Sequence, residues 1–190
     1  MISIPNEPLP LKRTCIRVLL IIVMAGFSVI TGCSDEHRIK IGDIPPEISG
    51  NDIQGRPISL SKLRGKVVIL CFWTTSCCGD ILTRLQPFQS NSKDKGLTVL
   101  AVNVGNSKET VESYAKDYAL TFTLLTDTNS KLFKQYQIVG FPTIFIIDRN
   151  GIVREKIMGD IQTENLLKLV VKQFKIQKEI ETNYNKAHNK

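Results

Sequence analysis

The sequence is poor in the residues that usually hold metal ions. Its 190 residues include only two histidines, and one of these, His188, stands near the C-terminus. Two histidines make a weak ligand set for zinc or for other metals that favour imidazole. The sequence therefore predicts neither a metal ion nor an organic cofactor.

A dense basic face is also missing. Lysine and arginine together outnumber aspartate and glutamate by 25 to 18, which gives a net charge of +7. The basic residues are scattered, apart from a lysine-rich C-terminus, and no zinc-finger or RNA-binding signature is present. Such charge usually lies on a solvated surface, so we expect no nucleic-acid partner.

No hydrophobic run is long enough for an ordinary membrane span. The apolar run Val18–Ile30 has thirteen residues and follows three basic residues, as in a signal peptide. It ends in "ITGCS", Ile30–Ser34, which resembles the lipobox of bacterial lipoproteins. The resemblance implies a signal peptide over 1–32, lipidation of Cys33, and a domain on the extracytoplasmic (periplasmic) side of a membrane in a bacterial cell envelope. An uncleaved anchor with a chance cysteine is the alternative.

The rest of the chain alternates between strand and helix patterns. We expect a tether over 33–43, a domain over 44–174 and a polar tail over 175–190 that frays. Strands are expected over 66–73, 96–104, 122–127, 141–148 and 152–158, and helices from about 80, over 107–119, over 130–137 and over 162–174. Pro87 should kink or end the first helix. The pattern predicts an α/β fold with a mixed sheet.

The most informative missing feature is a pair of cysteines separated by two other residues. Cys77 and Cys78 stand together where a buried strand gives way to a helix, but the position three after Cys77 is Asp80. At the N-terminus of a helix, the backbone N–H groups and the macrodipole favour a thiolate. The sequence therefore predicts that Cys77 is a nucleophile.

Three stretches carry a resemblance to a known family: "GRPISLSKLRGKVVILCFW", "GLTVLAVNVG" and "YQIVGFPTIFIIDRNGIV". Together they resemble the TlpA-like thioredoxins of the redoxin family, over about residues 42 to 174. The resemblance implies a thioredoxin-like fold, with a central mixed β-sheet flanked by helices. Turn signals at Asn51-Asp52 and Gln54-Gly55 add an N-terminal β-hairpin extension.

The same resemblance implies an active site around Cys77 and Cys78. Trp73 and Thr74 would precede the nucleophile, with Trp73 shielding it. Phe141 and Pro142 would lie opposite, joined by a cis peptide bond, and Phe141 would offer backbone groups to a bound peptide.

Asp80 breaks the family pattern, because the family has its resolving cysteine there. A carboxylate one turn from a thiol favours the neutral thiol, and it cannot form a disulfide. A Cys77–Cys78 bridge at the first turn of a helix is opposed by backbone geometry. Cys71 lies in the buried strand, where a free cysteine is usually a small hydrophobe. We expect a single nucleophilic cysteine that forms mixed disulfides.

The expected partners are substrate proteins or small-molecule thiols and disulfides, and the expected state is a monomer. Two other functions stay open. Thr74, Cys77 and Asp80 imitate the spacing around the reactive cysteine of peroxiredoxins, although Leu70 stands where those enzymes have a proline. A thioredoxin fold without a resolving cysteine can also serve as a redox-inactive binding module.

Overall fold

The computed structural model describes residues 38–92 and 96–188. The expected signal peptide, the lipidation site Cys33 and the first part of the tether lie outside these residues. Within them, no helix combines the length and the hydropathy that a membrane crossing needs.

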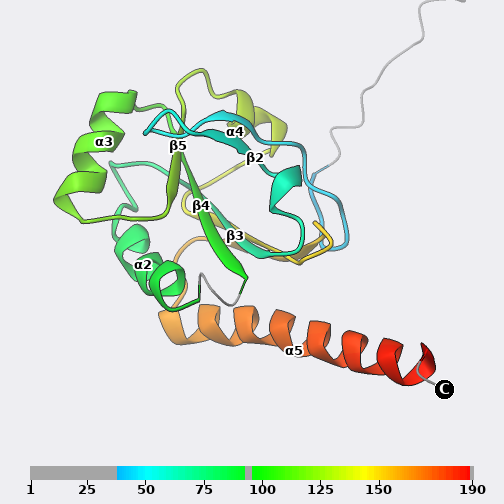
Figure 1. Cartoon of the computed structure of the whole chain (residues 1–190). Helices are drawn as coiled ribbons and strands as arrows, with labels where there is room; N and C mark the ends of the chain where they lie inside the picture. Colours follow the sequence, from blue (N-terminus) through cyan, green and yellow to red (C-terminus); the bar gives the residue numbers. More distant parts are fainter. Residues whose placement is uncertain (1–37, 93–95, 189–190) are drawn as a thin grey trace, which may run out of the picture. The chain divides into compact units, whose positions relative to one another are not determined.

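A five-stranded mixed sheet forms the centre of the domain (Figure 1). Its strands are β3 (Val67–Trp73), β4 (Leu97–Val104), β5 (Thr123–Asp127), β6 (Thr143–Ile147) and β7 (Val153–Met158), in the order β5-β4-β3-β6-β7. β3 runs parallel to β4, and β4 parallel to β5, whereas β6 and β7 are each antiparallel to their neighbour. All seven residues of β3 are buried, because the strand is central and both faces of the sheet are covered.

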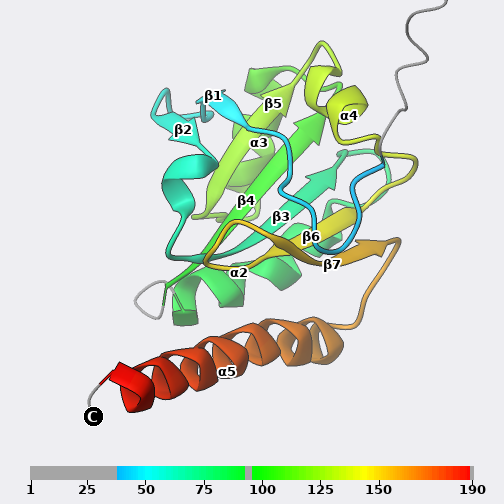
Figure 2. The same cartoon turned by 90° about the vertical axis from the view of Figure 1, so that its right-hand side faces the viewer.

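The helices and a small hairpin surround this sheet (Figure 2). They are η1 (Ser61–Leu63), α2 (Asp80–Ser92), α3 (Lys108–Asp117), α4 (Lys131–Gln135) and α5 (Thr163–His188), and the hairpin joins β1 (Ser49–Asn51) to β2 (Pro57–Ser59). Between these two short strands, the Asp52 carboxylate accepts the backbone N–H groups of Gln54 and Arg56. This arrangement is the thioredoxin-like fold with the N-terminal hairpin that the sequence predicted.

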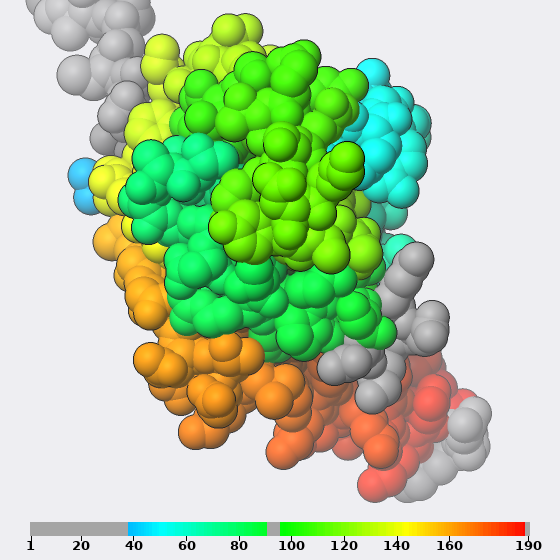
Figure 3. Space-filling model, turned by 90° about the vertical axis from the view of Figure 1, so that its left-hand side faces the viewer, coloured from blue at the N-terminus to red at the C-terminus, as the bar shows by residue number. Residues whose placement is uncertain are grey.

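Alternation along β3 divides the core into two clusters, one on each face of the sheet. Val67, Ile69, Cys71 and Trp73 pack with apolar side chains of α2, α3 and α5. The intervening residues of β3 pack on the other face with Tyr136 and the segments around α4. Figure 3 shows α2, α3 and the start of α5 next to one another over the first face. The candidate site residues predicted from the sequence lie at one end of this covered face.

α2 continues through Pro87, where a kink or an end was expected, and ends at Ser92. α5, however, runs further than the sequence suggested. α5 continues to His188, so the expectation that the chain frays after Phe174 was wrong. The last turns are held by polar contacts instead of core contacts: within the helix the Gln177 side chain donates to Glu181 at 3.2 Å, and Glu181 pairs at 3.3 Å with Arg149 in the turn between β6 and β7. Pairs four residues apart support a helix that is already nucleated by its buried first turns.

Candidate active site

Two loops meet where β3 ends. The first, which we call the cysteine loop, covers residues 74–79 between β3 and α2. The second, the proline loop, covers residues 140–142 before β6. Because Phe72 is paired with Thr143 across the two strands, Pro142 follows alongside Trp73 at the same end of the sheet. The peptide bond between Phe141 and Pro142 is cis, as the sequence predicted.

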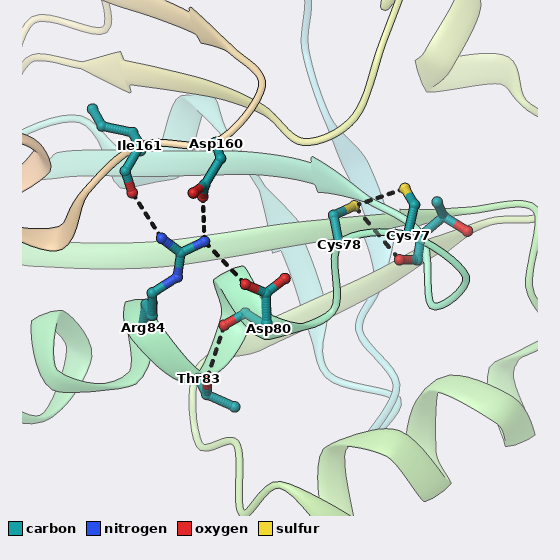
Figure 4. A network of polar contacts seen from close by, with 8 residues as sticks. Cys77, Cys78, Asp80, Thr83, Arg84, Asp160 and Ile161 are labelled. Atoms are coloured by element: carbon teal, nitrogen blue, oxygen red, sulfur yellow. Dashed lines mark hydrogen bonds and ion pairs between the residues drawn. The ribbon is translucent and has the colours of Figure 1, made fainter.

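The cysteine loop carries one exposed and one buried thiol (Figure 4). The Cys77 thiol donates to the Cys78 sulfur over 3.3 Å, and the Cys78 thiol donates to the Thr74 carbonyl over 3.6 Å. α2 begins only at Asp80, so both cysteines precede the helix. The expectation that they stand in its first turn, held apart by helical geometry, was wrong.

Burial gives Cys78 a different character from an exposed thiol. Its side chain is 5% exposed. Burial, followed by smaller effects that include Cys77 and Asp80, raises the pKa of Cys78 to about 11. The neutral thiol is therefore the stable form of Cys78 in the resting protein.

Cys71 is a core residue, as the sequence predicted. It is fully buried in the middle of β3 and belongs to the same apolar cluster as Trp73. Burial strongly raises the pKa of the Cys71 thiol. A thiol that is both neutral and closed off from solvent cannot meet an external disulfide.

Tyr114 of α3 holds the cysteine loop from one side, and the sequence analysis did not find it. Its ring packs against Trp73 at 5.1 Å and stacks on Tyr118 at 4.4 Å. Its hydroxyl lies so close to Gly79 that a Cβ there would stand 2.0 Å from the oxygen. Only glycine fits at that position. A glycine directly after the cysteines was the available signal of this close approach.

Polar contacts hold the same loop to β4. The Thr75 hydroxyl donates to the Asn106 side chain at 3.1 Å, and the backbone N–H of Asn106 donates to Asn103 at 3.2 Å. Asn103 is in turn paired with Trp73 between β3 and β4. Thr74, a predicted site residue, exchanges a hydrogen bond with the Ser76 hydroxyl at 3.3 Å.

Asp80 faces an arginine and not only a thiol (Figure 4). The Arg84 guanidinium donates to the Asp80 carboxylate at 3.1 Å, to the Ile161 carbonyl at 2.9 Å, and to Asp160. The hydrogen bond from Arg84 holds the pKa of Asp160 below its ordinary value. Arg84 thus ties α2 to the segment before α5 and partly offsets the charge of Asp80. The spacing of four residues between Asp80 and Arg84 was a readable signal of this pair.

The remaining predicted site residues are more deeply packed than expected. Trp73 is fully buried and lies beneath the loop. Phe141 is half-buried, contacts both core clusters, and lies 5.8 Å from the Phe133 ring. Two carbonyls of the proline loop accept hydrogen bonds: the Thr143 hydroxyl donates to the Gly140 carbonyl at 2.7 Å, and the Gly159 N–H donates to the Pro142 carbonyl at 2.8 Å.

Comparison with known proteins places this geometry in a family. The model of the AhpC/TSA family matches residues 41–156. The thiol-disulfide oxidoreductase ResA of Bacillus cereus is 31% identical over 161 residues, which cover 82% of this chain and 93% of that protein. The ResA of Geobacillus kaustophilus is 32% identical over 157 residues, which cover 81% of this chain and 90% of that protein.

A solved structure agrees with these relatives. A Chlorobium tepidum protein described as a candidate thiol:disulfide interchange protein DsbE superposes with a TM-score of 0.67 at 28% identity, and the match covers 71% of this chain and 98% of that one. The residues that the family model matches include both the cysteine loop and the proline loop. The chain therefore belongs to the AhpC/TSA family, as a thioredoxin-fold protein related to the thiol-disulfide oxidoreductases ResA and DsbE.

Proposed function

We propose that this protein is a thiol–disulfide oxidoreductase that reacts through Cys77. The supporting observation is the exposed Cys77 thiol in the cysteine loop, which leaves β3 at the same end of the sheet where the cis Phe141–Pro142 bond precedes β6. The relatives that share this frame are themselves named thiol-disulfide oxidoreductases.

Cys77 is the single nucleophile toward the substrate in this proposal. Its thiolate attacks one sulfur of a substrate disulfide and forms a mixed disulfide, and the other substrate sulfur leaves as a thiolate. Cys77 has access to solvent, whereas Cys71 and Cys78 are buried. Asp80 offers no sulfur with which to release the intermediate.

The surroundings of Cys77 suit a polypeptide substrate. In this proposal the half-buried Phe141 lies at the same end of the sheet as the cysteine loop, and its backbone would contact an extended peptide. Trp73 is buried beneath the loop, and Thr74 belongs to it. Substrate proteins, or small-molecule thiols and disulfides, are therefore the proposed partners of the monomer.

The proposed location is the extracytoplasmic side of a membrane in a bacterial envelope, with Cys33 as the lipidated residue. Its support is the sequence around Ile30–Ser34. Replacing Cys33 by alanine should move the protein out of the detergent phase in a phase-partition experiment. A mature N-terminus mapped at another residue by mass spectrometry would contradict this location of the anchor.

Insulin reduction with dithiothreitol as the electron donor tests the activity. The full chain in detergent should accelerate the reaction, and Cys77→Ser should not. Cys71→Ala is the matched control, because it removes a thiol that is buried in β3. Equal rates for the native chain and Cys77→Ser would contradict the proposal.

The same proteins discriminate the other functions. Consumption of peroxide through Cys77, without insulin reduction, would identify a thiol peroxidase. Arg84, the arginine beside Asp80, is already engaged by Asp80, Asp160 and Ile161, and it offers no special support for that function. If the Cys77 thiol reacts with neither a disulfide nor peroxide, a redox-inactive binding module is the function that remains.

A further inference from the structure

The two sulfurs of the cysteine loop are arranged one above the other. Cys77 is exposed, Cys78 is buried beneath it, and their Sγ atoms are 3.3 Å apart. A substrate sulfur bound to Cys77 would therefore project toward solvent. Cys78 would face the same Cys77 sulfur from the protein interior.

The other side chains near the loop cannot take this position. Asp80 has no sulfur, and its carboxylate is directed to Arg84. Cys71 lies within β3. Its thiol donates to the Phe72 carbonyl at 3.9 Å and not to Cys77. Among the described cysteines, Cys78 is the one whose sulfur touches the nucleophile.

We infer that Cys78 is the resolving thiol of this protein and that it releases substrate from Cys77 by forming a vicinal Cys77–Cys78 disulfide. The inference rests on the proposed function, because it begins from the mixed disulfide on Cys77. It gives the chain an internal dithiol cycle at a spacing different from that of its family.

The electrons balance in two exchanges. In the first, the Cys77 thiolate bonds to one sulfur of the substrate disulfide, and the second substrate sulfur leaves as a thiolate and takes up a proton. In the second, Cys78 bonds to the Cys77 sulfur, the bond between Cys77 and the substrate breaks, and the departing substrate sulfur takes up the proton that Cys78 loses. The substrate disulfide gains two electrons, and the cysteine pair loses two. An external dithiol then reduces the Cys77–Cys78 bond.

The geometry of adjacent residues makes this bond easy to reduce. Neighbouring Cα atoms are about 3.8 Å apart across a trans peptide, whereas disulfide-bonded cysteines usually have Cα atoms roughly 4.4–6.8 Å apart. The vicinal bridge is therefore strained, and strained disulfides are the labile or catalytic ones. A bridge that forms to expel substrate and is then quickly reduced fits a catalytic intermediate.

Glutathione disulfide is a suitable probe of this step. The full chain would carry Cys15→Ser, Cys33→Ser and Cys71→Ala, so that only Cys77 and Cys78 remain. This background would be treated with glutathione disulfide, quenched with acid at intervals, and analysed by intact mass. The matched variants add Cys78→Ser or Cys78→Ala, which keep Cys77 but remove the second sulfur.

The expected results differ in what stays on the protein. The background should pass through a glutathione adduct and end as a chain that lacks two hydrogens and carries no glutathione. Cys78→Ser and Cys78→Ala should both retain one glutathione per chain, with release slower by roughly a hundredfold or more, since an oriented neighbouring group is far more effective than one in solution.

Two other outcomes would overturn the inference in different ways. If the background retains glutathione as long as the Cys78 variants do, Cys77 reacts but Cys78 does not resolve, and the proposed function survives. If no variant with Cys77 takes up glutathione, the proposed function itself fails and the inference fails with it.

Discussion

The cysteine loop and the proline loop lie at the same end of the sheet but are held in different ways. The proline loop is closed by carbonyls, which accept from the Thr143 hydroxyl and from the Gly159 N–H. The cysteine loop depends on side chains from other elements, above all Tyr114 of α3 and Asn106 after β4.

This difference bears on where substitution is compatible with the fold. The hydrogen bonds of the proline loop join its carbonyls to Thr143 of β6 and to Gly159, so a change of backbone there would disturb the sheet. Asp80, the first residue of α2 after the cysteine loop, has a largely exposed side chain that pairs with Arg84. Either a thiol or a carboxylate at position 80 is therefore compatible with the same fold.

The largest expected effect is the loss of the nucleophile of the cysteine loop, compared with the loss of a thiol that is buried in β3. Cys77→Ser should lower the rate of insulin reduction by about a thousandfold or more, because the attacking sulfur is lost. Cys71→Ala should change it less than about twofold, since Cys71 does not reach the substrate. A comparable loss in both variants would mean that the effect comes from the core and not from the nucleophile.

The next effect is a pH dependence that belongs to the cysteine loop alone, since Gly140, Phe141 and Pro142 do not titrate. In the native chain, burial above all raises the pKa of Cys78 to about 11, with smaller contributions from Cys77 and Asp80. In Cys77→Ser the contribution of Cys77 is lost, but burial still keeps the pKa of Cys78 above its ordinary value.

Below that pKa, the thiolate fraction and hence the rate of alkylation of Cys78 should rise about tenfold for each unit of pH. Iodoacetamide labelling followed by mass spectrometry would measure this rate. Cys71→Ala is added to Cys77→Ser so that Cys78 is the one thiol left in the domain. A rate that is already constant above about pH 9 would contradict the raised pKa of Cys78.

Restoring the family's thiol should have a moderate effect. Asp80→Cys supplies a sulfur at the family spacing from Cys77, so a bridge between positions 77 and 80 should form on oxidation. Insulin reduction should then become about tenfold faster. Asp80→Asn is the control, because it removes the same charge without adding a sulfur and keeps an oxygen that can accept from Arg84. Equal gains in both variants would assign the effect to charge.

The smallest expected effect compares one glycine from each loop. Gly79→Ala should lower the free energy of unfolding by about 1–3 kcal/mol, because its Cβ would meet the Tyr114 hydroxyl. Gly140→Ala should be close to neutral, since a Cβ there meets no atom within 4 Å. Urea unfolding of both variants measures the difference. Similar losses would mean that close packing is not what the cysteine loop requires.

Much of the fold was readable because it follows from local patterns. The apolar run of β3, the alternation that fills both faces of the sheet, and the turn residues of the two hairpins each reflect hydrogen bonding and burial within a short segment. The predicted burial of Cys71 and the cis bond before Pro142 were also confirmed. The extent of α5 was not, because side-chain pairs beyond Phe174 replace the apolar contacts on which the prediction relied.

The sequence by itself determined which chemistry is present at the join of β3 and α2: two thiols, one glycine and one carboxylate. Only the tertiary structure decided how these groups are used. It turned Asp80 toward Arg84, set Tyr114 over Gly79, and brought the buried Cys78 sulfur to 3.3 Å from Cys77. The spacing of Asp80 and Arg84 and the glycine at position 79 were readable signals, whereas the burial of Cys78 and the position of Tyr114 were not. These last two depend on where α2 begins and on how α3 packs against the cysteine loop, and such packing has no periodic signal in the sequence.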